Sequence, residues 1–330
     1  MQALSQLCQA GFSLGIELPL DNDWSPAGQN ARMRDDRPHG VPDLRQHAEL
    51  ARQVDRLGFR ALWVRDVPLY DPQFGDGAQV FETFSYLGYL AGITERILLG
   101  TAAVVLPLRQ PWLTLKAAAS IDQLSGGRLL LGVASGDRPV EYPVFGADFD
   151  NRGEAFRAQV ELLRSGGAGQ LPDGVQLLPA PAQQRLPLLV AGLAQQTPAW
   201  AGEHLDGWLA YPGTPDDHRR RCALWLAYPG TPDDHRRRCA LWRDVTGSKP
   251  YVSFIHLDLL ADPQAPLRRH RFGAAVGREG LIAELHAMRA AGVDHIGLHL
   301  RRNQRPLPET LAELGEYVLP SFHHQGASHV

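Results

Sequence analysis

The sequence predicts a single domain over residues 1–330, a (β/α)₈ barrel (TIM barrel) with loop insertions. Strand-like and helix-like segments alternate along the chain, which is typical of a parallel sheet covered by helices. The strand-like segments are mostly continuous apolar runs, as expected for strands buried on both faces. A doubly wound open sheet is the alternative, but no GxGxxG fingerprint follows the first strand.

The expected elements follow from hydrophobic periodicity and punctuation. Strands are expected at residues 12–18, 60–65, 97–104, 128–134, 186–191, 207–211, 251–258 and 293–300. Helices are expected at residues 42–57, 79–91, 110–123, 151–165, 196–204, 215–225, 232–242, 278–291 and 308–319. Several of these helices end at a glycine that leads into the next strand, the usual left-handed stop. We expect loops at 20–40, over the top of the barrel, and at 166–185, and a disordered tail at 323–330.

Composition excludes several classes of function. Apolar residues make up 44% of the chain and charged residues 21%, so the chain can fill a core. A net charge of −3 gives no reason to expect nucleic acid or a membrane as a partner. The uncharged N-terminus lacks a secretory pattern, so we expect a frayed segment leading into the first strand. Three cysteines without CxxC spacing indicate a reducing compartment, the cytoplasm.

An internal duplication stands out. Residues 209–225 (LAYPGTPDDHRRRCALW) are repeated letter for letter at 226–242. We expect the first copy to form the sixth strand and the surplus second copy to bulge outward, with an irregular segment at 226–231 between two short helices. The duplicated cysteines and histidines (Cys222, Cys239, His218 and His235) resemble a metal site, but they arose together by copying, so no metal is expected.

The strand ends carry the chemistry, because the active site of a barrel lies at the carboxyl ends of its strands. Three predicted strands end in small residues, which are Ala102 and Ala103, then Ala134, Ser135 and Gly136, then Ala191 and Gly192. Side by side, these ends would form a slot for a planar aromatic cofactor. The fifth of the eight strands runs into a helix, whose first N–H groups favour a phosphate.

Residues 97–146 carry the set GTAAVVLP, a helix, DQLSGGR and a strand ending in small residues before VFG. This set resembles the bacterial luciferase-like flavin-dependent oxidoreductases, and the segment that contains Trp63 and residues 190–209 support the match. The resemblance implies FMN, or the deazaflavin F420, across the strand ends. It also implies that Ala102 and Ala103 contact the ring, often with a cis peptide bond between them, and that Trp63 is a cofactor-binding residue.

The resemblance assigns further positions. Ala134, Ser135 and Gly136 stand where luciferase has Cys-Arg-Gly, so Ser135 replaces a phosphate-binding arginine. Residues Gly192, Leu193, Ala194 and Gln195 match the phosphate loop, with Leu193 where many relatives carry a hydroxyl. Arg138 is a candidate to assist the phosphate.

Departures from the family pattern bear on catalysis. Asp66 lies where luciferase has Glu-His-His, so light emission is not expected, and Asp66 either contacts the flavin or substrate or is structural. His299, at the end of the last strand, is a candidate acid/base, whereas His256 is expected to be a satisfied buried histidine. Trp24, Tyr211 and Arg301 are candidate substrate contacts.

The function predicted is a monooxygenase that uses reduced FMN and O₂ on a small organic substrate. A separate flavin reductase is expected to supply the reduced FMN. F420-dependent hydride transfer is one alternative, and a non-catalytic flavin-binding barrel is another. A homodimer is expected, formed through residues 79–91 and 110–123.

Overall fold

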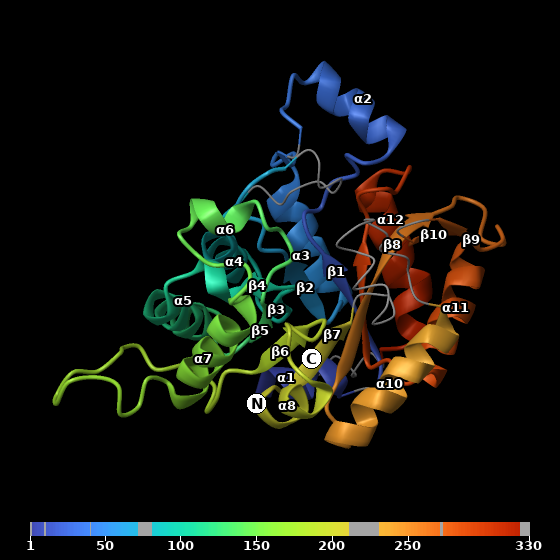
Figure 1. Ribbon diagram of the computed structural model, residues 1–330. Helices are drawn as coiled ribbons and strands as arrows, with labels where there is room; N and C mark the ends of the chain where they lie inside the picture. Colours follow the sequence, from blue (N-terminus) through green and yellow to red (C-terminus); the bar gives the residue numbers. More distant parts are fainter. Residues whose placement is uncertain are drawn as a thin grey trace, which may run out of the picture.

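The computed structural model describes residues 2–9, 11–39, 41–71, 81–210, 231–270 and 273–323. Its centre is a closed barrel of parallel strands (Figure 1). The barrel strands are β1 (Ser13–Glu17), β2 (Ala61–Val64), β3 (Leu98–Thr101), β5 (Leu129–Ala134), β6 (Leu188–Ala191), β7 (Gly207–Ala210), β8 (Tyr251–Leu259) and β11 (His295–His299). Each pairs in parallel with its neighbour, and β11 pairs with both β1 and β8, which closes the sheet. The predicted barrel and its eight strands are confirmed.

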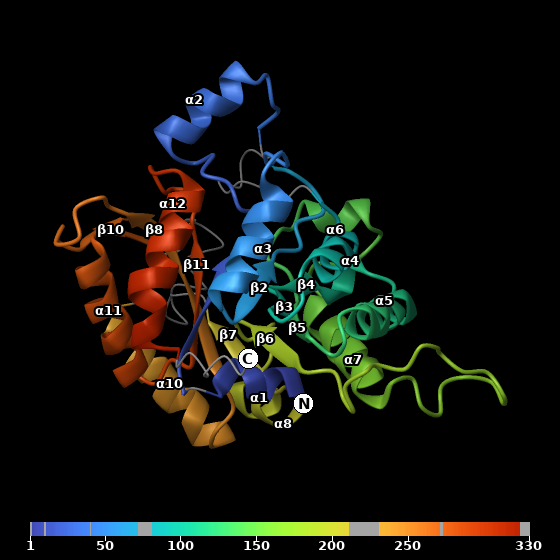
Figure 2. The same cartoon turned by 180° about the vertical axis from the view of Figure 1, so that it is seen from behind.

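Helices surround the barrel in both views (Figures 1 and 2). They are α3 (His47–Leu57), α4 (Thr83–Ile93), α5 (Pro111–Leu124), α7 (Arg152–Ser165), α8 (Pro198–His204), α10 (Pro232–Thr246), α11 (Arg278–Ala290) and α12 (Leu307–Glu313). A π-turn, η2 (Leu314–Val318), and a 3₁₀ turn, η3 (Leu319–Ser321), continue α12. The main core lies between these helices and the sheet, and a second apolar cluster fills the barrel interior.

The N-terminus differs from the expectation of a frayed segment. Residues Gln2–Cys8 form helix α1, which lies at the end of the barrel opposite α2 (Figure 1). Ala3 and Leu7 are fully buried and belong to the cluster that fills the barrel interior. The gain from burying these side chains stabilises a helix too short to form alone.

The loop expected at 20–40 contains helix α2 (Pro26–Arg34). Ser25 caps it, because its side chain accepts the N–H of Gly28, and Pro26 occupies the first helical position. Smaller elements also absent from the prediction are β4 (Val104–Val105), η1 (Leu106–Leu108), α6 (Glu141–Val144), β9 (Arg268–His270) and β10 (Gly273–Val276). Segment 166–185 has no helix or strand, as expected, and it extends away from the barrel (Figure 1).

The two copies of the duplication contribute different elements. The first two residues of the first copy, Leu209 and Ala210, end strand β7 as expected. Helix α10 begins in the second copy, at Pro232. The second copy therefore does not bulge outward, because Cys239 and Trp242 are buried against the barrel. The expected helix 215–225 and most of segment 226–231 lie outside the described residues.

At the other end of the chain, His323 is buried rather than solvated. Its Nε2 accepts the N–H of Leu14 at 2.8 Å, so Nδ1 carries the proton and donates to the carbonyl of Gly58 at 2.9 Å. Residues 324–330 of the predicted tail lie outside the described residues. Among the helices that the structure describes, none is long and apolar enough to cross a membrane.

Candidate active site

The carboxyl ends of the barrel strands form a mouth with two unlike walls. Residues at the ends of β3, β5 and β6 form a small wall, which we define as Ala102, Ala103, Ala134 and Ala191. All four alanines belong to or pack against the cluster in the barrel interior. Residues of β8, β11 and β1, with Arg65 just after β2, form a polar wall, which we define as Glu17, Arg65, His256 and His299.

The small wall carries only small side chains. Each of its four side chains is a single methyl group, and Ala134 and Ala191 are partly exposed although their strands are otherwise buried. The peptide bond between Ala102 and Ala103 is cis, as the resemblance implied. Ser135 is buried and Gly136 is partly exposed at the next turn. A side chain at Gly136 would meet Tyr142 Oη at 2.6 Å, so this position requires glycine.

Trp63 lies in the barrel interior. Its side chain is fully buried, its Nε1 donates to His295 Nε2 at 2.9 Å, and its ring packs edge-on against Phe254. A Cβ at Gly100 would approach the indole to 2.3 Å, so the neighbouring strand leaves room for it. The structure thus places Trp63, which the resemblance assigns to the cofactor-binding residues, in the barrel interior.

The polar wall is a buried cluster of ionisable groups. Arg65 Nε donates to Glu17 Oε1 in an ion pair with a fully buried carboxylate. The imidazoles of His256 and His299 stack with centroids 4.2 Å apart. Burial, followed by neighbouring histidine and arginine charges, holds the pKa of His299 well below its usual range. Burial and then Arg65 do the same to the pKa of His256, so both imidazoles are neutral at pH 7.

Trp24 and Arg301, predicted as substrate contacts, lie beside this wall. The Trp24 indole packs against His299 with centroids 4.8 Å apart and the two rings tilted by 36°. Arg301 is buried and donates to both oxygens of Asp21 at 2.7 and 3.1 Å, with its guanidinium 4.9 Å from the Trp24 ring. The arginine therefore anchors the loop that carries Trp24. Tyr211 lies outside the described residues.

Asp66, predicted as catalytic, forms hydrogen bonds that connect several segments around the mouth. Its carboxylate accepts Thr83 Oγ1 at 2.9 Å, Val105 N–H at 2.9 Å and two donors of Arg109 at 2.6 and 3.0 Å. These partners join the end of β2 to α4 and to β4, which follows Ala103. Of the two roles left open by the sequence, this geometry favours the structural one.

The predicted phosphate loop, 192–195, is a tight turn. Gly192, Ala194 and Gln195 all have positive φ, of 59°, 47° and 63°. Gly192 donates its N–H to Leu209 O, and Gln196 donates its N–H to Leu193 O. Helix α8 starts only at Pro198 and Thr197 caps it, so fewer helical N–H groups face the loop than the sequence predicted.

A second buried acid lies on the β5 side of the mouth. Glu141 in α6 is 2% exposed, and burial raises its pKa to about 7 although Arg138 acts in the opposite direction. Arg138, predicted to assist the phosphate, is thus buried next to a carboxyl group.

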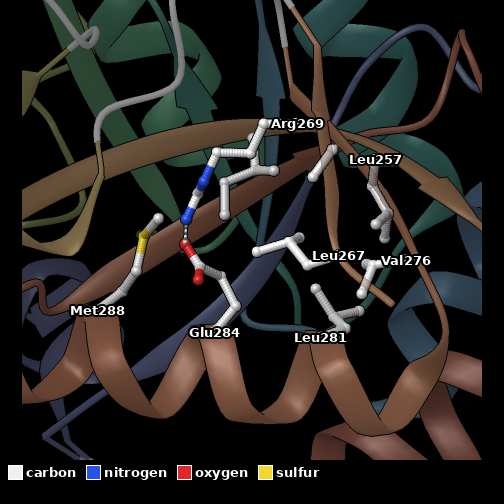
Figure 3. Close-up of a pocket in the computed structure, with 9 residues that line it drawn as sticks. Leu257, Leu267, Arg269, Val276, Leu281, Glu284 and Met288 are labelled. Carbon is white, nitrogen blue, oxygen red and sulfur yellow. Dashed lines mark hydrogen bonds and ion pairs between the residues drawn. The ribbon is translucent and has the colours of Figure 1, made fainter. Parts of the chain in front are cut away.

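A cavity elsewhere in the barrel wall is too small for a substrate. It lies between β8, β10 and α11, with Arg269 bound to Glu284 at 2.7 Å across its polar side and with Leu281 and Met288 on its apolar side (Figure 3). Its volume of about 10 Å³ holds one water at most. The mouth of the barrel remains the candidate site.

The sequence reasoning missed Glu17 and Arg65, and it treated His256 as structural. Glu17 ends β1 and Arg65 directly follows β2, which was the available signal, whereas His256 lies inside β8. Strand pairing brings Glu17 beside His299, and His299 beside His256. Hydrophobic periodicity predicts the strands but not which of their residues pair.

Comparison with known proteins identifies the family. The luciferase-like monooxygenase family matches residues 24–227. An uncharacterised protein of Mycobacterium tuberculosis is 27% identical over 215 residues, covering 58% of this chain and 74% of that protein. The alkanal monooxygenase alpha chain of Photorhabdus luminescens is 28% identical over 166 residues, covering 47% of this chain and 44% of the relative.

Solved structures agree in fold. A monooxygenase from Streptomyces bottropensis superposes with a TM-score of 0.70 at 18% identity, covering 94% of this chain and 100% of its own. An F420-dependent secondary alcohol dehydrogenase gives 0.69 at 16% identity, with coverages of 95% and 99%. A type II Baeyer–Villiger monooxygenase from Pseudomonas putida in complex with FMN gives 0.65 at 12%, with coverages of 96% and 99%. The family match covers more than half of the sequence, so this chain belongs to the luciferase-like monooxygenases.

Proposed function

We propose that this protein is a flavin-type oxidoreductase, a monooxygenase that uses reduced FMN and O₂ on a small organic substrate. The observation that carries the proposal is the small wall at the barrel mouth, where four methyl groups at the ends of three neighbouring strands line one side. The family match and the FMN complex of a protein with the same fold support it.

Different residues would hold the ring and the phosphate tail of the cofactor. The small wall would carry the ring, and the exposed side of the turn 192–195 would carry the phosphate tail. Asp66 and Arg109 would position the strand segment that contains Ala103, through the hydrogen bonds that tie β2 to β4. The bound cofactor would supply the redox and O₂ chemistry.

The rest of the mouth would serve the substrate. Trp24 packs over His299, so its indole is the apolar surface that faces a molecule entering from this side. A desolvated site of this kind excludes water from the reaction. No nicotinamide fingerprint occurs in the sequence, so we expect a separate reductase to provide reduced flavin.

The second candidate is F420-dependent hydride transfer without oxygen. The observation in its favour is the polar wall, which offers neutral imidazoles for the proton that accompanies a hydride. An F420-dependent alcohol dehydrogenase shares the fold.

Binding and turnover separate the two candidates. The purified chain is titrated with FMN and with F420 while fluorescence quenching is followed. Reduced FMN is then supplied under air, and F420 under argon with alcohols or aldehydes. Substrate-dependent oxygen uptake with FMN supports the proposal, and F420 reduction without oxygen supports the second candidate. Absence of binding by both cofactors would contradict both.

A further inference from the structure

Three ligand-type side chains meet on the polar wall. Glu17 is in register with His299 across β1 and β11, and His299 is in register with His256 across β11 and β8. In-register residues of parallel strands point to the same side of the sheet. One ligand atom from each of the three side chains lies within 4.8 Å of the others.

Two of these side chains have buried atoms that find no hydrogen-bond partner among the residues that the structure describes. Glu17 Oε2 and His299 Nδ1 are such atoms, in side chains that are 0% and 1% exposed. A buried polar atom without a partner is costly, so atoms of this kind call for an explanation. We propose that Glu17, His256 and His299 bind one divalent transition-metal ion, which supplies the missing partner to both atoms.

The donor set selects the kind of ion. Two imidazole nitrogens and one carboxylate oxygen suit Zn²⁺, Fe²⁺ or Co²⁺, whereas Mg²⁺ and Ca²⁺ prefer all-oxygen sites. Two histidines and a carboxylate also leave coordination positions open, as in catalytic sites.

Arg65 is the main opposing group and gives the site a distinctive property. Its guanidinium is bound to Glu17 Oε1, so it orients the carboxylate and leaves Oε2 for the ion. The same positive charge repels a cation, and Arg301 is already neutralised by Asp21. Removing the charge of Arg65 should therefore tighten metal binding, an effect that an accidental surface site would not show.

The inference goes beyond the proposed function. An ion on the polar wall would face the small wall across the mouth, where it could polarise a substrate oxygen as a Lewis acid. In this arrangement His299 acts as a ligand, in place of the acid/base role predicted from the sequence. Metal binding is measured without flavin, so either idea can fail without the other.

The test is a titration of the chelator-stripped full-length chain. Zn²⁺ is followed by calorimetry, Co²⁺ by its visible absorption, and Mg²⁺ serves as the unsuited ion. We expect one equivalent of Zn²⁺ per chain, a Co²⁺ spectrum indicating nitrogen ligands, and no comparable binding of Mg²⁺. His299→Ala and Glu17→Gln should each weaken Zn²⁺ at least tenfold, and Arg65→Gln should strengthen it.

Control variants separate this site from accidental binding. His204→Ala alters a partly exposed histidine stacked on Trp200, outside the polar wall. A variant with both His324→Ala and His329→Ala alters the C-terminal histidines. Neither should change the stoichiometry or the affinity. Glu17→Gln breaks a buried ion pair and could unfold the protein. His256→Ala therefore serves as a second ligand variant, and melting curves show whether each variant is folded. Zn²⁺ binding unchanged by His299→Ala and His256→Ala in folded protein, or no Zn²⁺ binding by the parent, would overturn the proposal.

Discussion

Trp242 and Trp225 are the same residue in two identical copies, and they should differ sharply in effect. Trp242 is fully buried, its ring lies 5.6 Å from that of Trp208, and its Nε1 donates to Lys249 O at 3.0 Å. Replacing such a side chain by alanine costs about 3–5 kcal/mol. The packing position beside Trp208 is already taken by Trp242, so Trp225→Ala should cost less than about 1 kcal/mol.

The assay is urea unfolding of both variants beside the parent, with thermal melting as a second readout. Trp242→Ala should lower the melting temperature by roughly 10 °C, since about 1 kcal/mol shifts it by a few degrees in a chain of this size. Equal losses for the two variants, or a larger loss for Trp225→Ala, would refute the assignment of α10 to the second copy.

The same reasoning extends to deletion of a whole copy. Removing 209–225 or 226–242 yields one and the same sequence, because the copies are identical. The single remaining copy would then supply both the end of β7 and the helix as far as its tryptophan, which would pack beside Trp208. The connection between Ala210 and the capping threonine shortens from 20 residues (211–230) to three. Loop-closure entropy then favours the deletion variant by about 1.7 kcal/mol, and a large fall in melting temperature would contradict this.

Three further predictions concern the mouth and the surface. Burial raises the pKa of Glu141 to about 7 from 4.5, so the folded state favours its protonated form, and the stability present below pH 4.5 declines as pH rises through 7. Glu141→Gln should reduce this loss of stability by about 1–2 kcal/mol, a figure that allows for solvent screening. Urea midpoints of the parent and the variant at pH 5 and pH 8 measure the difference. A variant with the same pH profile as the parent would contradict this prediction. Gly192→Asp should weaken FMN far more than riboflavin, because a carboxylate would stand beside the phosphate, and equal loss for both would indicate general damage. Leu113 and Leu124 of α5 are 68% and 71% exposed, so a homodimer through α4 and α5 should appear in light scattering at micromolar concentration, and a monomeric mass would exclude it.

The barrel was predictable because its strands are apolar runs of suitable length separated by helical periodicity. The missed elements have identifiable reasons. Helix α1 is short and depends on burying Ala3 and Leu7 in the barrel, which local sequence does not reveal. Helix α2 did carry a signal, a serine followed by a proline at Ser25 and Pro26, which is a typical helix start.

The candidate site was predictable only in part. The rule that active sites lie at strand ends led to Ala102, Ala103 and His299. It did not show whether Asp66 has a structural or a catalytic role. The structural role depends on hydrogen bonds from Arg109 and Val105, about 40 residues away in the chain. Nor could it join Glu17 to His256 and His299, since their proximity requires closure of the barrel between its first and last strands.

The measurement that tests the central claim most directly is the affinity of Ala103→Trp for FMN and F420. Ala103 is 8% exposed at the small wall, and an indole there would fill the surface proposed for the ring. Ala168→Trp, in the exposed loop 166–185, is the matched control. We predict that the parent and Ala168→Trp bind at least one of the two cofactors, and that Ala103→Trp loses this binding at least a hundredfold with an unchanged melting curve. Undiminished affinity in folded Ala103→Trp would contradict the placement of the cofactor on the small wall.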